Sequence, residues 1–308
     1  MLKYLTVIIV ILLISCNRSE LHDSIEMKWK ILNRKLPNNI SLYKGHDPSI
    51  PIKAWSVVIP YNNSSKNIVK ILISSDHDGV ETPESFAIKN NALVVINGGY
   101  FSRGKNSMHH VGLLKTNGVL KESASGSVIR DNIRYNITRG AFGVFDDGNI
   151  DIGWASTKND SIFIWGKPIK NRPGSPGILD YKESAYWKVF EALHAGPILI
   201  NEGEINITSE QEVFFNTPVD GVQPRSAIGY TVKGEIVIMV VDGRQVESRG
   251  AYLKELALLM SQFNCFEAIN LDGGGSSALI VDGKLVNSPI GLNSQREVMS
   301  TIAILSED

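Results

Sequence analysis

Short apolar runs, four to seven residues long, recur along the chain and constrain the fold more than any other feature. Runs of this length that are rich in Val and Ile are typical of buried strands, whereas a helix needs about ten residues or more. The sequence therefore predicts a strand-rich fold. We expect strands over residues 55–59, 68–73, 93–96, 162–165, 197–200, 236–241, 268–271, 278–281 and 299–305.

Residues 250–264 have helical rather than strand periodicity. Their apolar side chains recur at spacings of three and four residues, which places them on one face of a helix. The segment follows the apolar run 236–241 and precedes the run 268–271. A strand, a helix and a strand in this order predict a right-handed crossover between parallel neighbouring strands. The apolar face consists of Leu253, Leu256, Ala257, Met260 and Phe263.

A hairpin completes the expected architecture. Residues 279–286 have the pattern of two strands joined by the two-residue turn Asp282-Gly283. Together with the crossover, this hairpin predicts an α/β fold of the mixed α+β kind. We expect a central mixed β-sheet with flanking helices in a single domain.

The stretch 268–281, AINLDGGGSSALIV, places three consecutive glycines between two apolar runs. Consecutive glycines lose much backbone entropy on folding, so they occur where φ is positive or where a ligand must approach the backbone. A tight turn is the simpler alternative. The amides of such a loop, with the hydroxyls after it, can form a concave donor site for phosphate oxygens. The candidate phosphate-binding residues are Gly273, Gly274, Gly275, Ser276 and Ser277.

Charged residues stand at the ends of the apolar runs. Asp242 and Asp272 follow the two strands that flank the helix, so we expect them near each other at the carboxyl edge of the sheet. Paired carboxylates are candidates for acid–base or nucleophilic chemistry. A guanidinium suits bidentate phosphate recognition, although each arginine alone is also consistent with a solvated surface position. The candidates are Arg225, Arg244 and Arg296.

The segment LVVINGGYF, residues 93–101, is another buried strand, and it runs into Asn97, Gly98 and Gly99. Asn97 can donate to a sugar hydroxyl or a phosphate, and the two aromatic residues after the glycines can offer a stacking face. Alternatively, the glycines form a bulge and the aromatic rings belong to the core. His194 is a further candidate acid or base, since no zinc-binding motif surrounds any histidine.

The amino terminus predicts a membrane anchor. Its first 16 residues combine a lysine, a short apolar run and the ending Leu-Ile-Ser-Cys, which resembles a bacterial lipobox. We expect a lipoprotein signal peptide over residues 1–16, lipidation of Cys16, and a chain held on a bacterial membrane that faces the periplasm or the cell surface. An uncleaved anchor helix is the alternative. Residues 17–50 suit a tether that leads into a domain over residues 51–308.

Overall charge excludes one class of partner. The chain has 31 basic and 32 acidic residues and a net charge of -1. Neither nucleic acid nor a bulk anionic membrane surface is indicated as a partner held by charge. The other cysteine, Cys265, lies in an apolar context and is expected to be a buried hydrophobic residue rather than a nucleophile.

Several of these motifs together resemble the phosphodiester glycosidase family. In chain order they are ETPESFA, VINGGYF, AGPILI, PRSAIGYT, VDGR and NLDGGGSSALIVDGKLVN, and they cover residues 80–305. The resemblance implies a mixed α/β catalytic domain that hydrolyses a glycosyl-1-phosphodiester at the sugar C1–O bond. We expect a glycosyl phosphodiester or phosphorylated glycan as substrate, and neither a metal nor another cofactor. It implies the following site residues: Asn97, Arg225, Asp242, Arg244, Glu255, Asp272, Gly274 and Ser276.

Two departures from the family pattern are visible. Ser226 stands where threonine is common, and the cysteine-rich and membrane-spanning portions of the animal members have no counterpart, so their substrate does not carry over.

The expected chemistry uses these residues in different roles. Asp272 or Asp242 serves as base or nucleophile, Glu255 or His194 assists, and the arginines neutralise the phosphate. Two alternatives stay open. One is a surface glycan-binding module without turnover, and the other is a phosphodiesterase whose metal ion is held by Asp242 and Asp272.

Overall fold

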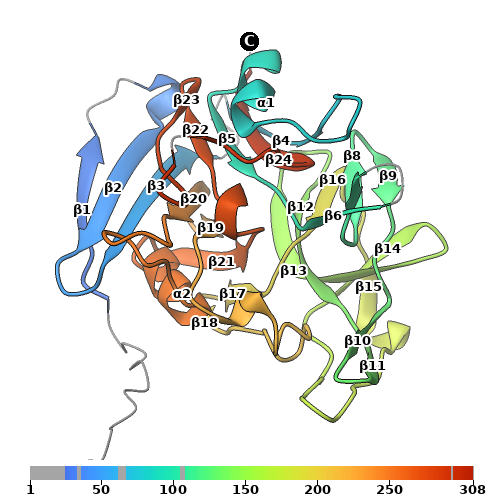
Figure 1. Cartoon of the computed structure of the whole chain (residues 1–308). Coiled ribbons are helices and arrows are strands. Elements are labelled where there is room, and N and C mark those ends of the chain that lie inside the picture. Colours follow the sequence, from blue (N-terminus) through green and yellow to red (C-terminus); the bar gives the residue numbers. More distant parts are fainter. Residues whose placement is uncertain (1–24, 33–35, 62–66, 105–107, 293, 308) are drawn as a thin grey trace, which may run out of the picture.

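A computed structural model describes residues 25–32, 36–61, 67–104, 108–292 and 294–307 of the chain (Figure 1). Strands are its main regular elements, and the α-helices within these residues are α1 (Pro83–Lys89) and α2 (Leu253–Ser261). The expected α/β fold with flanking helices is therefore wrong, because the protein is mostly β. Two short helices cannot cover the faces of so many strands, so the sheets pack largely on one another.

Three large sheets make up the molecule. The eight-stranded sheet has the order β1 (Lys28–Leu32), β2 (Ser41–Asp47), β3 (Ile52–Pro60), β20 (Glu235–Val241), β19 (Arg225–Thr231), β21 (Cys265–Asn270), β17 (Ile198–Asn201) and β18 (Glu204–Ile205). The seven-stranded sheet has the order β15 (Ser184–Tyr186), β14 (Ser161–Trp165), β13 (Ile150–Lys158), β12 (Arg139–Val144), β16 (Glu191–His194), β8 (Leu114–Thr116) and β9 (Val119–Glu122). The five-stranded sheet has the order β23 (Lys284–Leu285), β22 (Leu279–Val281), β5 (Val94–Asn97), β24 (Ser300–Ser306) and β4 (Asn67–Ile73).

Smaller elements connect these sheets. Two ribbons pair β6 (Phe101–Arg103) with β7 (Met108–His110) and β10 (Ser127–Arg130) with β11 (Ile133–Asn136). The 3₁₀ turns are η1 (Pro37–Asn39), η2 (Tyr181–Glu183), η3 (Pro218–Asp220) and η4 (Gly274–Ser276).

All nine apolar runs expected to be strands coincide with or overlap strands of the structure, and the expected helix is confirmed as α2.

The strand pairings of the described residues are all antiparallel, so the expected mixed sheet is wrong. Strands β20 and β21 do run in the same direction on either side of α2. They are not neighbours, however, because β19 lies between them and pairs antiparallel with both. A strand–helix–strand pattern in the sequence predicts that the two strands run in the same direction. It does not show that a strand from earlier in the chain lies between them.

This arrangement brings several loops to one edge of the sheet. Arg225, the first residue of β19, pairs with Val241, the last residue of β20. Ala227, two residues later, pairs with Asn270, the last residue of β21. The loops that follow β20 and β21 therefore open beside the start of β19, as the sequence predicted for that edge.

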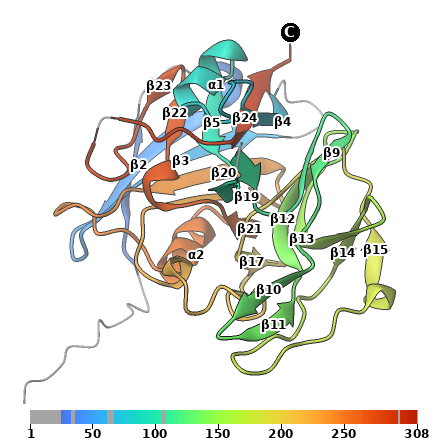
Figure 2. The same ribbon diagram turned by 45° about the vertical axis from the view of Figure 1, so that its right-hand side comes forward.

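The main hydrophobic core lies between the three large sheets, which surround it in both views of the ribbon (Figures 1 and 2). It contains buried side chains from each sheet, among them Val57, Ile238, Trp154 and Ile302. A second cluster lies between α2 and the eight-stranded sheet.

The expected hairpin of β22 and β23 is confirmed, and Asp282 (φ 52°) and Gly283 (φ 66°) have the left-handed conformations of a type I′ turn.

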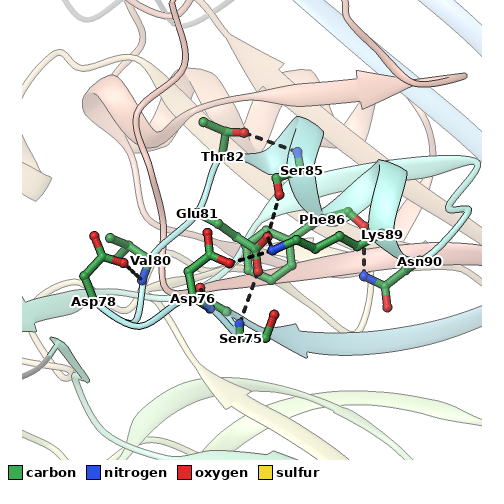
Figure 3. A network of polar contacts seen from close by, with 11 residues as sticks. Ser75, Asp76, Asp78, Val80, Glu81, Thr82, Ser85, Phe86, Lys89 and Asn90 are labelled. Atoms are coloured by element: carbon green, nitrogen blue, oxygen red, sulfur yellow. Dashed lines mark hydrogen bonds and ion pairs between the residues drawn. The ribbon is translucent and has the colours of Figure 1, made fainter.

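Helix α1 covers the five-stranded sheet and is held by the polar network of Figure 3. Thr82 caps the helix by accepting a hydrogen bond from the amide of Ser85 (3.2 Å). The buried carboxylate of Glu81 accepts from the Ser85 hydroxyl (2.6 Å) and lies 2.6 Å from the ammonium of Lys89, which also binds Asp76. The network fixes the helix against β5, whose last residue is Asn97.

The eight-stranded sheet begins within residues 17–50, the segment that we interpreted as a tether. Strand β1 pairs with β2, and β2 pairs with β3. The expected signal peptide, the lipidated Cys16 and residues 17–24 lie outside the described residues. Among the residues that are described, none of the helices combines the length and apolarity needed to span a bilayer.

Candidate active site

A pocket of about 170 Å³ lies at the sheet edge where β19 begins and where the loops after β20 and β21 open. Six predicted site residues line it: Arg225, Arg244, Arg296, Asp272, Gly273 and Gly274. Tyr100, one of the two aromatic residues considered for a stacking face, also lines it, and three further lining residues were not predicted: Pro218, Val219 and Gln223. Among the described lining residues, Asp272 is the one carboxylate, and it shares the pocket with three guanidinium groups.

Asp272 is half-buried at the end of the loop after β21. Burial raises the pKa of its carboxyl group to about 6, and this rise is opposed by the nearby Ser276 hydroxyl, the Gly273 amide and the charge of Arg296. Oδ1 accepts a hydrogen bond from the Gly273 amide (2.9 Å). The group is therefore mostly ionised at neutral pH, yet it takes up a proton more readily than an exposed aspartate.

The glycine loop supports anion binding in a different way from the one expected. The amide of Gly273 donates to Asp272, and the amide of Gly274 donates to the carbonyl of Pro224 (2.9 Å). Two of the three amides expected to bind phosphate are thus used within the protein. A Cβ on Gly274 would lie 3.3 Å from Nη2 of Arg244, and one on Gly275 would lie 2.9 Å from Nη2 of Arg296. The glycines allow two guanidinium groups to approach the loop closely.

The three arginines differ in how firmly they are held. Arg225 is buried, its Nε donates to the carbonyl of Ala251 (2.9 Å), and Nη2 donates to the carbonyls of Val219 (2.8 Å) and Gly221. Burial lowers its pKa to about 10, so it stays protonated at neutral pH. Arg244 and Arg296 are exposed at the rim of the pocket.

Arg244 is oriented by its backbone and by a neighbouring side chain. It has a left-handed conformation (φ 58°), and its Nη2 donates to Oε1 of Gln223 (2.7 Å). The pocket therefore has one fixed positive charge and two at its rim, which suits an anionic ligand that enters from solvent.

Asn97, Gly98 and Gly99 join the sheet to the glycine loop. Asn97 is buried, and its Nδ2 donates to the carbonyl of Asp272 (2.7 Å) while its Oδ1 accepts from the Ser226 hydroxyl (2.6 Å). The amide of Asp272 donates to the carbonyl of Gly98 (3.1 Å). The expected donation from Asn97 to a ligand is replaced by these contacts, which position the backbone of Asp272.

Asp242 is not among the residues that line the pocket with Asp272. It is buried, and its Oδ1 accepts from Nδ2 of Asn287 (2.9 Å) and from the amide of Ser288 (3.0 Å). Nδ2 of Asn287 also donates to the carbonyl of Ser277 (2.8 Å). Burial raises the pKa of Asp242 to about 6. Its carboxylate therefore supports the end of the glycine loop rather than lining the pocket.

Glu255 lies at the amino terminus of α2 and has a structural role. Its fully buried carboxylate accepts from both Nη atoms of Arg249 (2.6 and 3.0 Å) and from the amide of Tyr252 (2.9 Å). These contacts combine a helix cap with a bidentate ion pair. Glu255 is not among the residues that line the pocket, so the contacts give no support to its expected role as an assisting acid.

His194 is also buried away from the pocket. Its Nε2 lies 3.2 Å from the carbonyl of Ala155, and burial, with the nearby His110 and Arg139, lowers its pKa to about 3. A Cβ on Gly99 would lie 2.6 Å from Nε2 of His110, so the glycine makes room for this histidine pair. A histidine this deeply buried stays neutral and contributes to packing.

Tyr100 is the aromatic residue that reaches the pocket. Its hydroxyl donates to the carbonyl of Gly196 (2.8 Å) and accepts from Nδ2 of Asn270 (3.0 Å). Burial raises its pKa, and so does the charge of Asp272, so the phenol stays protonated. Its position directly after the paired glycines was the sequence signal for a stacking face. Asn270 carried no comparable signal.

Comparison with known proteins adds to this geometry. The model of the phosphodiester glycosidase family matches residues 90–305. This chain belongs to the phosphodiester glycosidase family. The resemblance inferred from the motifs is therefore confirmed.

Relatives of this chain include two mammalian enzymes named N-acetylglucosamine-1-phosphodiester alpha-N-acetylglucosaminidase. The Homo sapiens protein is 29% identical over 170 residues, which cover 53% of this chain and 30% of that protein. The Mus musculus protein is 28% identical over 210 residues, which cover 68% of this chain and 35% of that protein. The chain thus spans about a third of the length of these relatives.

Two solved structures share the fold of this chain. The zebrafish N-acetylglucosamine-1-phosphodiester alpha-N-acetylglucosaminidase catalytic domain, auto-inhibited by its pro-peptide, has a TM-score of 0.57 at 22% identity and covers 92% of this chain and 84% of that one. A hypothetical protein from Synechocystis has a TM-score of 0.61 at 16% identity, and covers 92% and 64% of the two chains.

Two further observations concern metal binding and the choice of pocket. Within the described residues, no group of three or more His, Cys, Asp or Glu side chains is arranged to hold a metal ion. Asp242 and Asp272, which the metal-dependent alternative requires together, bind different partners.

A larger cavity, of about 690 Å³, contains none of the predicted site residues. We therefore take the smaller pocket as the candidate active site, because the motif residues converge there.

Proposed function

We propose that this chain hydrolyses a glycosyl-1-phosphodiester at the bond between the sugar C1 and the phosphate oxygen. The observation that carries the proposal is one pocket in which a single carboxylate of raised pKa, Asp272, meets three arginines. Membership of the phosphodiester glycosidase family supports it. The arginines complement a phosphodiester anion, and the carboxylate supplies a group that can accept a proton.

The lone carboxylate suits this substrate. Most glycosidases use two carboxyl groups, one of which protonates a poorly leaving sugar oxygen. A phosphate monoester leaves as a stabilised anion and needs little protonation. In the proposed step, Asp272 accepts a proton from water while the water oxygen bonds to C1. The C1–O bond breaks, and its electron pair stays on the phosphate oxygen, whose charge the arginines stabilise.

Substitution of Asp272 by Asn tests this assignment, because it keeps the shape of the side chain and removes its charge. We expect kcat for release of free sugar from a glycosyl-1-phosphodiester to fall by at least about a hundredfold. The matched control is Asp282→Asn, which changes an exposed acid in the hairpin turn and should leave kcat unchanged. Full activity of folded Asp272→Asn would exclude Asp272 as the base.

The products of the wild-type reaction test the bond that is cleaved. Free sugar and a phosphate monoester are expected. Release of sugar 1-phosphate instead would identify a phosphodiesterase, and loss of activity with a chelator that added divalent metal restores would identify a metal-dependent one. Binding of the diester without any turnover would identify a glycan-binding module.

We also propose that Cys16 is lipidated and holds the enzyme on a bacterial membrane, facing the periplasm or the cell surface. The sequence Leu-Ile-Ser-Cys after a short apolar run supports this location. A surface location would give the enzyme access to phosphorylated glycans outside the cytoplasm.

A further inference from the structure

The larger cavity lies at the opposite end of β19 from the candidate active site. Strand β19 begins at Arg225 in the active-site pocket and ends at Thr231, which lines the cavity of about 690 Å³. Six residue steps of about 3.4 Å separate the two sites by roughly 20 Å. The cavity volume falls within the range of about 300–1,000 Å³ that is typical of ligand sites. The two sites are therefore separate, and the distal one has room for a small saccharide.

Aromatic side chains form part of the cavity wall. Tyr230 and Phe266 come from the neighbouring strands β19 and β21, and their ring centroids lie 6.4 Å apart. Both rings are only partly buried. Tyr61 adds a third ring, which is fixed because its hydroxyl donates to the carbonyl of Gly148 (2.6 Å). Partly exposed aromatic faces beside a cavity offer apolar surface for the C–H face of a sugar ring and an attractive surface for a cation.

The charge of the cavity is opposite to that of the active-site pocket. Four carboxylates line it, whereas none of its described lining residues is Lys or Arg. Burial raises the pKa of the Tyr230 hydroxyl, and the charges of two more nearby acids, Glu267 and Asp151, raise it further. A phosphate group would be repelled here, whereas a positively charged group would be attracted. The four lining acids are Asp146, Asp147, Glu235 and Glu307.

We propose that this cavity is a second carbohydrate site, which binds a saccharide that carries a free ammonium group. The sugar ring packs against Phe266 and Tyr230, and the ammonium lies near the acids of the β12–β13 turn and of β20. This site is independent of the hydrolytic reaction, because it shares no lining residue with the active-site pocket. It would hold an amine-bearing glycan on the enzyme surface while the other end of the sheet acts on a phosphodiester.

The test is a binding titration of the full-length protein with two probes of equal length. The β-1,4-linked tetrasaccharide of glucosamine carries four amines, and its fully N-acetylated counterpart carries none. We expect the amine form to bind at least about fivefold more tightly, and we expect Asp146→Asn and Phe266→Leu each to weaken its binding at least about threefold. Asp146→Asn keeps the shape of an exposed side chain, and Phe266→Leu replaces a partly buried ring by a smaller apolar group, so folding should be preserved.

Control variants separate this proposal from the hydrolytic function. Asp272→Asn and Arg244→Ala alter only the active-site pocket and should leave binding of the glucosamine tetrasaccharide unchanged. The proposal is overturned if that tetrasaccharide does not bind, if it binds equally to Asp146→Asn and Phe266→Leu, or if Arg244→Ala abolishes the binding. None of these measurements depends on hydrolysis of the diester. Failure of the saccharide-binding proposal would therefore not contradict the proposed hydrolysis, and failure of the proposed hydrolysis would not contradict saccharide binding.

Discussion

At the scale of single residues, the proposed chemistry depends on the environment of Asp272. Its backbone is held by Asn97 and Gly98, and its side chain faces arginines at a half-buried position. Desolvation and positive charge act on its pKa in opposite directions, and burial prevails. The result is a carboxylate that is ionised at neutral pH and still able to accept a proton near that pH.

The raised pKa of Asp272 predicts a pH dependence of the reaction. A base must be ionised, so kcat/KM should rise with pH through about 6 and level off above that value. Initial rates between about pH 4.5 and 8.5 measure this profile. Asp242→Asn, which removes the other aspartate with a pKa near 6, should leave the midpoint in place. A rate that falls as pH rises through 6 would contradict the role of base and indicate an acid.

The close approach of Arg296 to the glycine loop predicts the effect of a single methyl group. In Gly275→Ala the new Cβ would lie 2.9 Å from Nη2 of Arg296 and displace the guanidinium. We expect KM for the diester to rise several-fold with little change in melting temperature, because Arg296 is exposed and can move. Gly126→Ala is the control, since no atom lies within 4 Å of its Cβ position. An unchanged KM in Gly275→Ala would show that Arg296 does not bind the substrate.

At the scale of elements, helix α2 shows why the sequence predicts some site residues and not others. Its periodicity predicted the helix, and the ends of its flanking strands predicted where Asp242 and Asp272 would lie. The sequence does not reveal where a side chain points after a strand ends. Asp272 faces the pocket, whereas Asp242 binds Asn287 and Glu255 caps the helix. A polar residue that holds a loop and one that faces a ligand have the same local pattern.

The cap of α2 predicts the effect of removing Glu255. Glu255→Ala deletes the cap and leaves the guanidinium of Arg249 without its bidentate partner, so the free energy of unfolding should fall by about 2–4 kcal/mol. Urea unfolding measures the change, and Glu210→Ala, at an exposed position, is the control. If the folded variant lost its kcat without losing stability, Glu255 would have a catalytic rather than a structural role.

At the scale of the whole molecule, three sheets enclose one core, and this packing was not predictable from local patterns. Apolar runs identified most of the buried strands of the eight-stranded and five-stranded sheets, but they missed β19, which is buried at the centre of the eight-stranded sheet. Many strands of the seven-stranded sheet are short, or their apolar residues alternate with polar ones, as in β9 (Val119–Glu122). Such strands lack the continuous apolar run from which a strand was predicted. The position of β19 between β20 and β21 depends on long-range pairing that no local pattern encodes.

Two buried histidines within this packing predict acid sensitivity. Burial lowers the pKa of His110 to about 4 and that of His194 to about 3. Below pH 6.5 the unfolded chain takes up protons that the folded chain cannot, so the histidines lower the stability as pH falls. Asp242 and Asp272 have the opposite effect on stability. Their pKa values are raised, so the folded chain takes up these protons more readily than the unfolded chain, and the two acids raise the stability as pH falls below about 6.

A variant isolates the contribution of one histidine. The drop in the free energy of unfolding between pH 7 and pH 5 should be smaller in His110→Gln than in the wild type, by about 1–2 kcal/mol. Urea unfolding at the two pH values measures the difference. Equal drops in the two proteins would show that His110 is protonated in the folded state as readily as in the unfolded state.

The amino terminus predicts how the whole molecule is placed in the cell. The described fold begins at Ile25, which packs in the cluster beneath α2, and Cys16 lies outside the described residues. Cys16→Ser should move the protein from the membrane fraction to the soluble fraction and abolish labelling by a radioactive fatty acid, with an unchanged melting temperature. Cys265 is retained in this variant and is buried, so any label that is lost belongs to Cys16. Retention of Cys16→Ser in the membrane fraction would instead support an uncleaved anchor helix.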